Sequence, residues 1–181
     1  MQAPKFPLFR FHPDPIQSGS VIPSGATCCV CHEARGHIYA GPIYGECDEI
    51  EALCPWCIAD GSAHQRYEVT FHEADLAGDP PPEVREEIDE RTPGFATFNP
   101  IEWPACCQSP MAYLEPVGIA EIRARHYTLE GGLMGRIVHE LGLSGGAANR
   151  FLESFRRDTS PTVHVFHCLQ CDTKQGVIDS L

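Results

Sequence analysis

The sequence predicts a small, loop-rich α+β domain stabilised by zinc, with zinc-ribbon-like cysteine knuckles, short β-hairpins and two or three helices. Three observations support this class. The length of 181 residues suits one ordinary domain. Sixteen glycines and 16 prolines imply short elements joined by many turns. Ten cysteines occur largely in Cys-x-x-Cys pairs. We therefore expect a single domain over 1–181, with an N-terminal zinc-knuckle region of about 1–75, a helical insert of about 115–158 and a C-terminal knuckle over 160–181.

Strands are predicted where apolar and aromatic residues alternate. Residues 35–45 alternate in this way on both sides of Gly41-Pro42, which predicts a β-hairpin with its turn at these two residues. Segments 67–71 and 162–166 show the same alternation, and the second runs directly into Cys168. Both are predicted strands.

Three helices are predicted. The first opens after Asp79, because prolines 80–82 can occupy a first helical turn, and ends at Thr92-Pro93. The second and third cover 133–141 and 147–157, and glycines separate them. Leu133, Ile137 and Leu141 recur every four residues, so we expect them to face the core.

Two Cys-x-x-Cys pairs predict a structural zinc site. Cys28 and Cys31 form the first pair, Cys54 and Cys57 form the second, and 22 residues separate the pairs. Such a pair directs two sulfurs toward one point, and two pairs complete the tetrahedron that Zn²⁺ prefers. Four thiolates leave no position for water, so the metal is expected to stabilise the fold rather than to catalyse.

A second zinc site is predicted around the C-terminal pair. Cys168 and Cys171 need two further ligands, and the vicinal Cys106 and Cys107 are the first candidates. Adjacent residues seldom bind one ion together, so one of the two could be replaced by His164, His167 or Cys47. Two zinc ions are therefore expected, and Cys29 is interpreted as an ordinary thiol.

Several catalytic chemistries are disfavoured. Cys54-Pro-Trp-Cys57 also occurs as a redox motif, but such a motif should follow a buried strand and open a helix, whereas DEIEAL precedes it here. The metalloprotease, zinc-deaminase, P-loop, dinucleotide-binding and GxSxG motifs are absent. We therefore expect a protein that is not an enzyme.

The charge and hydropathy patterns exclude other classes of partner. A net charge of −12 argues against binding to nucleic acid or to an anionic membrane, because both need a basic surface. No apolar run approaches the length of a membrane span, and the first 15 residues lack the apolar segment of a signal peptide. A cytoplasmic location is expected, where clustered thiols are more often metal ligands than disulfides.

Several segments resemble the CbrC-like family, formerly an uncharacterised family, which is named for a bacterial member linked to colicin tolerance. The resemblance rests on FRFHPDP at 9–15, RGHIYAGPIYG at 35–45, LCPWCIADGSAHQRYEVTF at 53–71, RTPGF at 91–95 and SPTVHVFHCLQC at 160–171. The family usually has His-Cys where this chain has Cys106-Cys107. The resemblance implies a small cytosolic zinc-binding protein without established enzyme activity, and it suggests tolerance or immunity to a toxin.

The function predicted from these features is non-enzymatic binding of another protein. We expect an immunity or tolerance factor that neutralises a bacterial toxin, such as a basic nuclease. Acidic residues accumulate between Asp75 and Glu90, where a negative field would attract a basic partner. The candidate partner-binding residues are Glu83, Glu86, Glu87 and Glu90. Two alternatives are a zinc-dependent enzyme with an open metal site near Cys107, Cys168 and Cys171, and an envelope-stress regulator.

Overall fold

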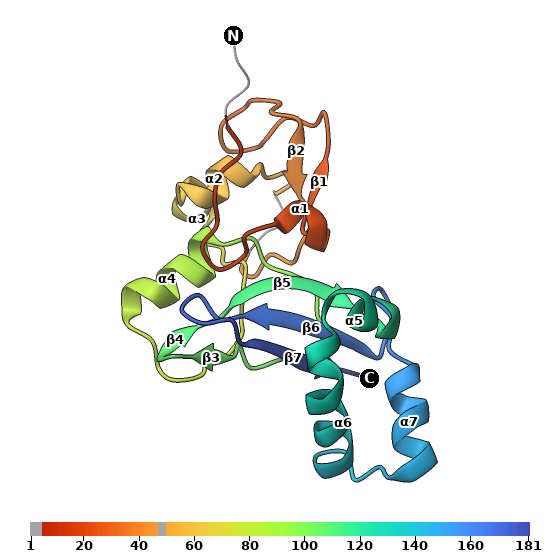
Figure 1. The fold of residues 1–181 in the computed structure, drawn as a ribbon. Coiled ribbons are helices and arrows are strands. Elements are labelled where there is room, and N and C mark those ends of the chain that lie inside the picture. Colours follow the sequence, from red (N-terminus) through yellow and green to blue (C-terminus); the bar gives the residue numbers. More distant parts are fainter. Residues whose placement is uncertain (1–4, 47–49) are drawn as a thin grey trace. The chain divides into compact units, whose positions relative to one another are not determined.

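The computed structural model describes residues 5–46 and 50–181 (Figure 1). The chain divides into two compact units. The first unit ends at Ala96, and the second unit is Thr97–Leu181. Each unit has its own apolar core.

The first unit is built from short elements separated by loops. Among its described residues, two strands form an antiparallel pair, and four helices of 4 to 10 residues accompany them. In chain order these are α1 Pro15–Ser18, β1 Val21–Pro23, β2 His37–Tyr39, α2 Pro55–Ala59, α3 Ser62–Tyr67 and α4 Pro82–Arg91.

The predicted hairpin over 35–45 is wrong. Its strand, β2, pairs with β1 instead, with Val21 opposite Tyr39. Gly41 is required for a different reason than a hairpin turn, because a Cβ there would lie 2.7 Å from Cζ of the Tyr39 ring, which folds over it. The alternation of residues 35–45 identifies a strand, but it does not identify the strand's partner.

The segment 67–71, a predicted strand, contributes less than expected. Its first residue, Tyr67, ends α3, and Thr70 forms only an isolated antiparallel bridge with Tyr44. By contrast, the expected helix after Asp79 is present as α4. It starts at Pro82 and ends at Arg91, and Thr92 is extended before Pro93.

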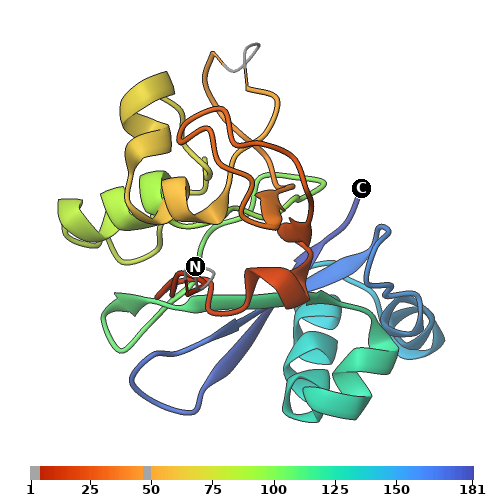
Figure 2. The ribbon, with the colours of Figure 1, turned by 90° about the horizontal axis from the view of Figure 1, so that it is seen from above.

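The second unit is a three-stranded antiparallel sheet with helices on one face. The sheet has the order β5-β6-β7, and a separate two-stranded hairpin, β3-β4, precedes it. The elements are β3 Ala105–Cys106, β4 Ser109–Pro110, β5 Ala112–Val117, α5 Ile119–Arg125, the 3-10 helix Tyr127–Leu129, α6 Glu130–His139, α7 Gly145–Glu153, β6 Thr162–His167 and β7 Lys174–Asp179. Figure 2 shows the helices α5, α6 and α7 gathered beside the sheet.

The core of the second unit lies between these helices and the sheet. Val163 and Val165 of β6 pack with Leu133 and Ile137 of α6, which are buried as expected. Leu141 is 44% exposed because α6 ends at His139, so its expected place in the core is wrong.

The α+β class is confirmed, but the described residues contain seven α-helices rather than two or three. The three longest, α4, α6 and α7, are those that the sequence predicts. The other four have only 4 to 7 residues, which is too short to show a helical period. Within the part of the chain that the structure describes, no helix has both the length and the apolar character needed to cross a membrane.

Candidate metal centres

The first four-cysteine group lies in the core of the first unit. Cys28 and Cys31 come from the loop that precedes β2, Cys54 is the residue before α2, and Cys57 lies within α2. The four Sγ atoms lie within 4.8 Å of one another. Three of the separations are 3.9 Å between Cys28 and Cys57, 3.8 Å between Cys31 and Cys54, and 3.6 Å between Cys54 and Cys57.

These separations match a tetrahedral metal site. Four sulfurs at about 2.3 Å from a central zinc lie about 3.8 Å from one another. A disulfide would instead need about 2.05 Å between two sulfurs, and the nine cysteines in the described residues are all free thiols. The group therefore has the donor atoms and the spacing to hold one metal ion.

The local backbone is arranged to support a thiolate at Cys28. The N–H groups of Val30 and Cys54 donate to its Sγ at 3.4 and 3.3 Å. Burial raises the pKa of this thiol, but backbone hydrogen bonds, with that of Cys31 foremost, outweigh burial and lower the pKa to about 7. His32 closes the turn with a positive φ of 58° and an N–H bond to the Cys28 carbonyl. These donors were not identified from the sequence, although the third residue of a Cys-x-x-Cys turn, here Val30, is where an N–H donor to the first sulfur would be sought.

The second four-cysteine group lies in the second unit, where two turns meet. Cys106 ends β3 and Cys107 lies in the β3-β4 turn, while Cys168 directly follows β6 and Cys171 lies in the β6-β7 turn. All four Sγ atoms lie within 4.8 Å of one another. The separations of 3.8 Å between Cys106 and Cys107, Cys106 and Cys171, and Cys107 and Cys171 again match a tetrahedron around zinc.

The turn geometry explains how two adjacent cysteines reach the same point. Cys106 pairs with Ser109, which leaves Cys107 and Gln108 as a two-residue turn. Both have positive φ, 50° and 61°, as a type I′ turn requires. The chain therefore reverses immediately after Cys106, and the neighbouring side chains converge rather than pointing to opposite faces of a strand.

The thiols of the second group influence each other's ionisation. Hydrogen bonds with the side chain and the backbone of Thr173 lower the pKa of Cys171 to about 6. The interactions of Cys106 with Cys168 and Cys171 raise its pKa to about 12. The negative charge of one thiolate thus makes ionisation of the neighbouring thiols less favourable. A bound cation is therefore required for all four to be ionised together at neutral pH.

The two alternative histidine ligands are not brought into either group. His164 is buried in the sheet, with Nε2 3.3 Å from Oδ2 of Asp179 and Nδ1 3.3 Å from the Tyr113 hydroxyl. His167 belongs to neither of the groups found among the described residues. Cys47 lies outside the described residues.

The structure meets one of the two requirements for a redox motif at Cys54-Pro-Trp-Cys57 and fails the other. The motif opens a helix, α2, because Pro55 occupies the first helical position, but this helix already ends at Ala59. The residue before the motif, Leu53, is not in a strand. The two sulfurs are grouped with Cys28 and Cys31, as in a metal site.

The candidate partner-binding residues on α4 fall into two pairs. Glu83 and Glu86 are exposed. Glu87 lies 3.7 Å from the guanidinium of Arg10, and Glu90 lies 3.4 Å from Nε2 of His64, so each of these has an ionisable neighbour within its own unit.

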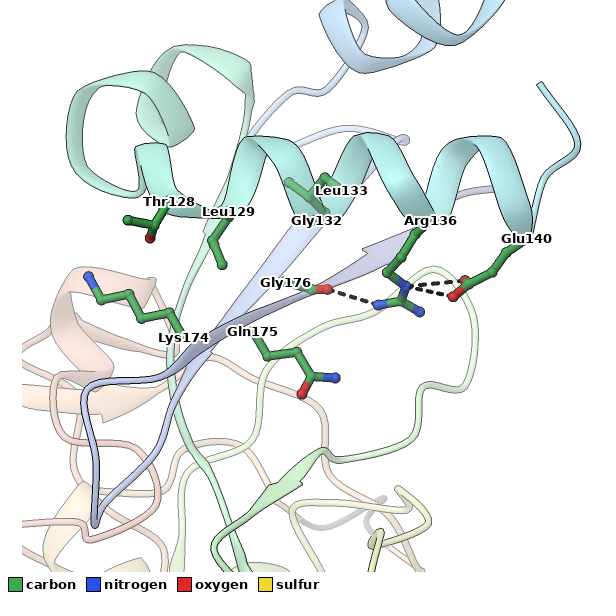
Figure 3. Close-up of a pocket in the computed structure, with 9 residues that line it drawn as sticks. All are labelled: Thr128, Leu129, Gly132, Leu133, Arg136, Glu140, Lys174, Gln175 and Gly176. Carbon is green, nitrogen blue, oxygen red and sulfur yellow. Dashed lines mark hydrogen bonds and ion pairs between the residues drawn. The ribbon is translucent and has the colours of Figure 1, made fainter. Parts of the chain in front are cut away.

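A separate pocket of about 500 Å³ lies in the second unit between the start of β7 and the segment from Thr128 to Glu140 (Figure 3). Arg136 crosses one side of it and donates to both carboxylate oxygens of Glu140, at 3.0 and 3.1 Å, and to the Gly176 carbonyl at 2.9 Å. The carboxylate on its wall is therefore already neutralised by Arg136. None of the eight grouped cysteines lines this pocket.

Comparison with known proteins identifies a family that covers almost the whole chain. The family model described as "Uncharacterised protein family (UPF0167)" matches residues 6–180. UPF0167 protein Mb2317 of Mycobacterium bovis is 37% identical over 177 residues, which cover 97% of this chain and 94% of that protein. UPF0167 protein PA1536 of Pseudomonas aeruginosa is 35% identical over 176 residues, which cover 93% of each chain. No solved structure matches. The chain therefore belongs to the uncharacterised protein family UPF0167.

Proposed function

We propose that the protein is a non-enzymatic zinc-binding protein, in which two four-thiolate zinc sites hold the fold and the acidic face of α4 binds a basic protein. The observation that carries the metal proposal is the convergence of eight cysteines into two groups with tetrahedral spacing. Each group joins two pairs of cysteines from segments far apart in the sequence, so the fold, and not local sequence alone, brings all four sulfurs together.

The donor set favours zinc. Tetrahedral sites with four sulfurs are typical of zinc or of iron, whereas calcium and magnesium prefer oxygen ligands. The two metals are distinguished by elemental analysis of the purified protein together with its visible spectrum. A colourless protein with close to two zinc ions per chain supports the proposal, and a coloured, iron-containing protein contradicts it.

The same geometry supports a role without catalysis. A catalytic zinc keeps one coordination position for water or substrate. In each group a fourth sulfur stands where that position would be, with Cys107 completing the second group. The resulting closed shell would stabilise structure without activating water.

The proposed partner is a basic protein, and a nuclease-type bacterial toxin is the partner that the CbrC resemblance suggests. The chain carries a net charge of −12, and a four-thiolate zinc site adds a net charge of about −2. Glu83 and Glu86 present exposed carboxylates from the first turns of α4. Such a surface would accelerate the capture of a basic protein in the cytoplasm, where we propose that the protein acts.

A charge-reversal experiment tests this surface. The double variant Glu83→Lys with Glu86→Lys is compared with Glu102→Lys with Asp158→Lys, which makes the same change of net charge at exposed residues of the second unit. Association with a colicin nuclease domain is measured at about 0.05 and 0.5 M salt, because screening removes long-range attraction at the higher value.

The proposal expects the α4 variant to associate more slowly than the control variant at low salt. Equal slowing of both variants would show general attraction by net charge and contradict a binding role for α4. Absence of any binding to the nuclease domain by the wild-type protein would contradict the proposed toxin partner.

A further inference from the structure

The two cysteine groups differ in their access to solvent. In the first group, Cys28, Cys54 and Cys57 are at most 2% exposed. In the second group, Cys107 and Cys171 are exposed, and only Cys168 is buried. Oxidants in solution therefore reach sulfur directly at the second group, because the susceptibility of a cysteine follows its exposure and thiolate character.

The groups also differ in their relation to the apolar cores. Three cysteines of the first group belong to the core cluster of the first unit, together with Leu53 and Ile58. The core cluster of the second unit contains Val163, Val165 and their helical neighbours, but no cysteine. A chemical change at the second group thus leaves the main core contacts of its unit in place.

Cys107 and Cys171 are the pair in the second group best suited to disulfide formation, because both are exposed, whereas Cys106, whose Sγ also lies 3.8 Å from that of Cys171, is half-buried. The Sγ atoms of Cys107 and Cys171 lie 3.8 Å apart, and each residue sits in a turn between strands. The vicinal pair of Cys106 and Cys107 is disfavoured, because adjacent Cα atoms are about 3.8 Å apart and disulfides need about 4.4 to 6.8 Å. Cys168 is too buried to be the thiolate that reacts first with peroxide.

We propose that the second group is a peroxide-sensitive site at which oxidation joins Cys107 to Cys171 and releases the zinc ion, a proposal that rests on the proposed two-zinc function. One exposed thiolate attacks hydrogen peroxide, forms a sulfenic acid and expels hydroxide. The second thiolate attacks that sulfur, forms the S–S bond and expels a second hydroxide. Two thiolates thus lose two electrons to the O–O bond, and two protons from solvent convert the hydroxides to water.

Zinc loss follows from the ligand count. Oxidation leaves Cys106 and Cys168 as the only thiolates of the group, and two ligands do not hold the ion that four held. The new covalent bond still ties the β3-β4 turn to the β6-β7 turn. The second unit is therefore expected to lose its metal while it keeps its sheet.

The test uses the full chain loaded with two zinc ions and treated with a small excess of hydrogen peroxide. A chromophoric chelator follows zinc release, and trypsin digestion without reductant locates the disulfide. Trypsin places Cys106 and Cys107 in the peptide 92–123, and Cys168 and Cys171 in the peptide 158–174. We expect one zinc released, one retained, and a cross-link between these two peptides.

Variants identify the sulfur that reacts. Cys106→Ser should retain the cross-link between the peptides, whereas Cys107→Ser should lose it, and neither result requires the variant to keep its zinc. Cys29→Ser is the matched control, because Cys29 belongs to neither group, and it should react as the wild type does.

The outcomes separate this inference from the proposed function. Fewer than two zinc ions before oxidation would overturn the proposed function and the inference with it. A two-zinc protein that loses both ions, loses neither, or forms its disulfide only within 158–174 would overturn the oxidation site alone.

Discussion

Replacing Cys54 with serine is expected to unfold the first unit. Cys54 is 1% exposed, and its Sγ lies 3.6 Å from that of Cys57 and 3.8 Å from that of Cys31. A structural zinc contributes about 10–16 kcal/mol in zinc-finger peptides, and three thiolates do not hold the ion with the affinity of four, so the loss of one ligand removes much of this free energy. The whole free energy of unfolding of a typical domain is only about 5–15 kcal/mol. The variant should therefore lose most of the stability of this unit.

Hydrogen exchange read by mass spectrometry gives the result for each unit separately. Peptides from 53–71 should lose their protection in Cys54→Ser, while those from 162–179 keep theirs, because the core of the second unit contains no cysteine of the first group. Cys29→Ser is the control, and it should change stability by less than about 1 kcal/mol. If Cys54→Ser keeps two zinc ions and the exchange pattern of the wild type, the assignment of a structural metal to this group is wrong.

Three further predictions concern packing and pH. Gly176→Ala should destabilise the second unit by about 1–3 kcal/mol through overpacking, because its Cβ would lie 2.9 Å from Cγ1 of Val163 and 3.1 Å from Cδ2 of Leu133. Chemical denaturation with an unchanged midpoint would contradict this. Gly135→Ala within α6 should instead stabilise by up to about 1 kcal/mol through helix propensity, since a Cβ there meets nothing within 4 Å, and a lowered melting temperature would count against the open helix face. Burial lowers the pKa of His12 from 6.5 to about 4. The neutral His12 therefore contributes its full share to the free energy of unfolding above pH 6.5, and about 3 kcal/mol of that free energy is lost as the pH falls toward 4. His12→Asn should therefore flatten the fall in stability between pH 7 and 5.5, measured by urea unfolding at equal zinc content, and identical slopes for both proteins would refute this origin.

The sequence predicted those features that depend on local spacing. The Cys-x-x-Cys turns place two sulfurs together whatever the rest of the chain does, so the first group could be assigned from Cys28, Cys31, Cys54 and Cys57 alone. The helix α4 has prolines at its start and a Thr-Pro stop at its end, and both act over a few residues.

Features that depend on distant pairing could not be predicted in the same way. One ligand of the second group was left open between a vicinal cysteine and His164, His167 or Cys47. The choice between Cys106 and the two histidines depends on the register of β6 between β5 and β7. That register places His164 opposite Val177, where its Nε2 meets Asp179. Likewise, nothing local in 35–45 indicates that its strand pairs with Val21–Pro23.

X-ray absorption at the zinc edge of the full-length protein tests the central claim most directly, because it reports which atoms surround the metal. The two four-cysteine groups predict two zinc ions per chain, each with four sulfur neighbours at about 2.3 Å and no nitrogen or oxygen neighbour. A spectrum that required nitrogen or oxygen at about 2.0–2.1 Å would place histidine, carboxylate or water in a site and contradict the closed four-thiolate shells.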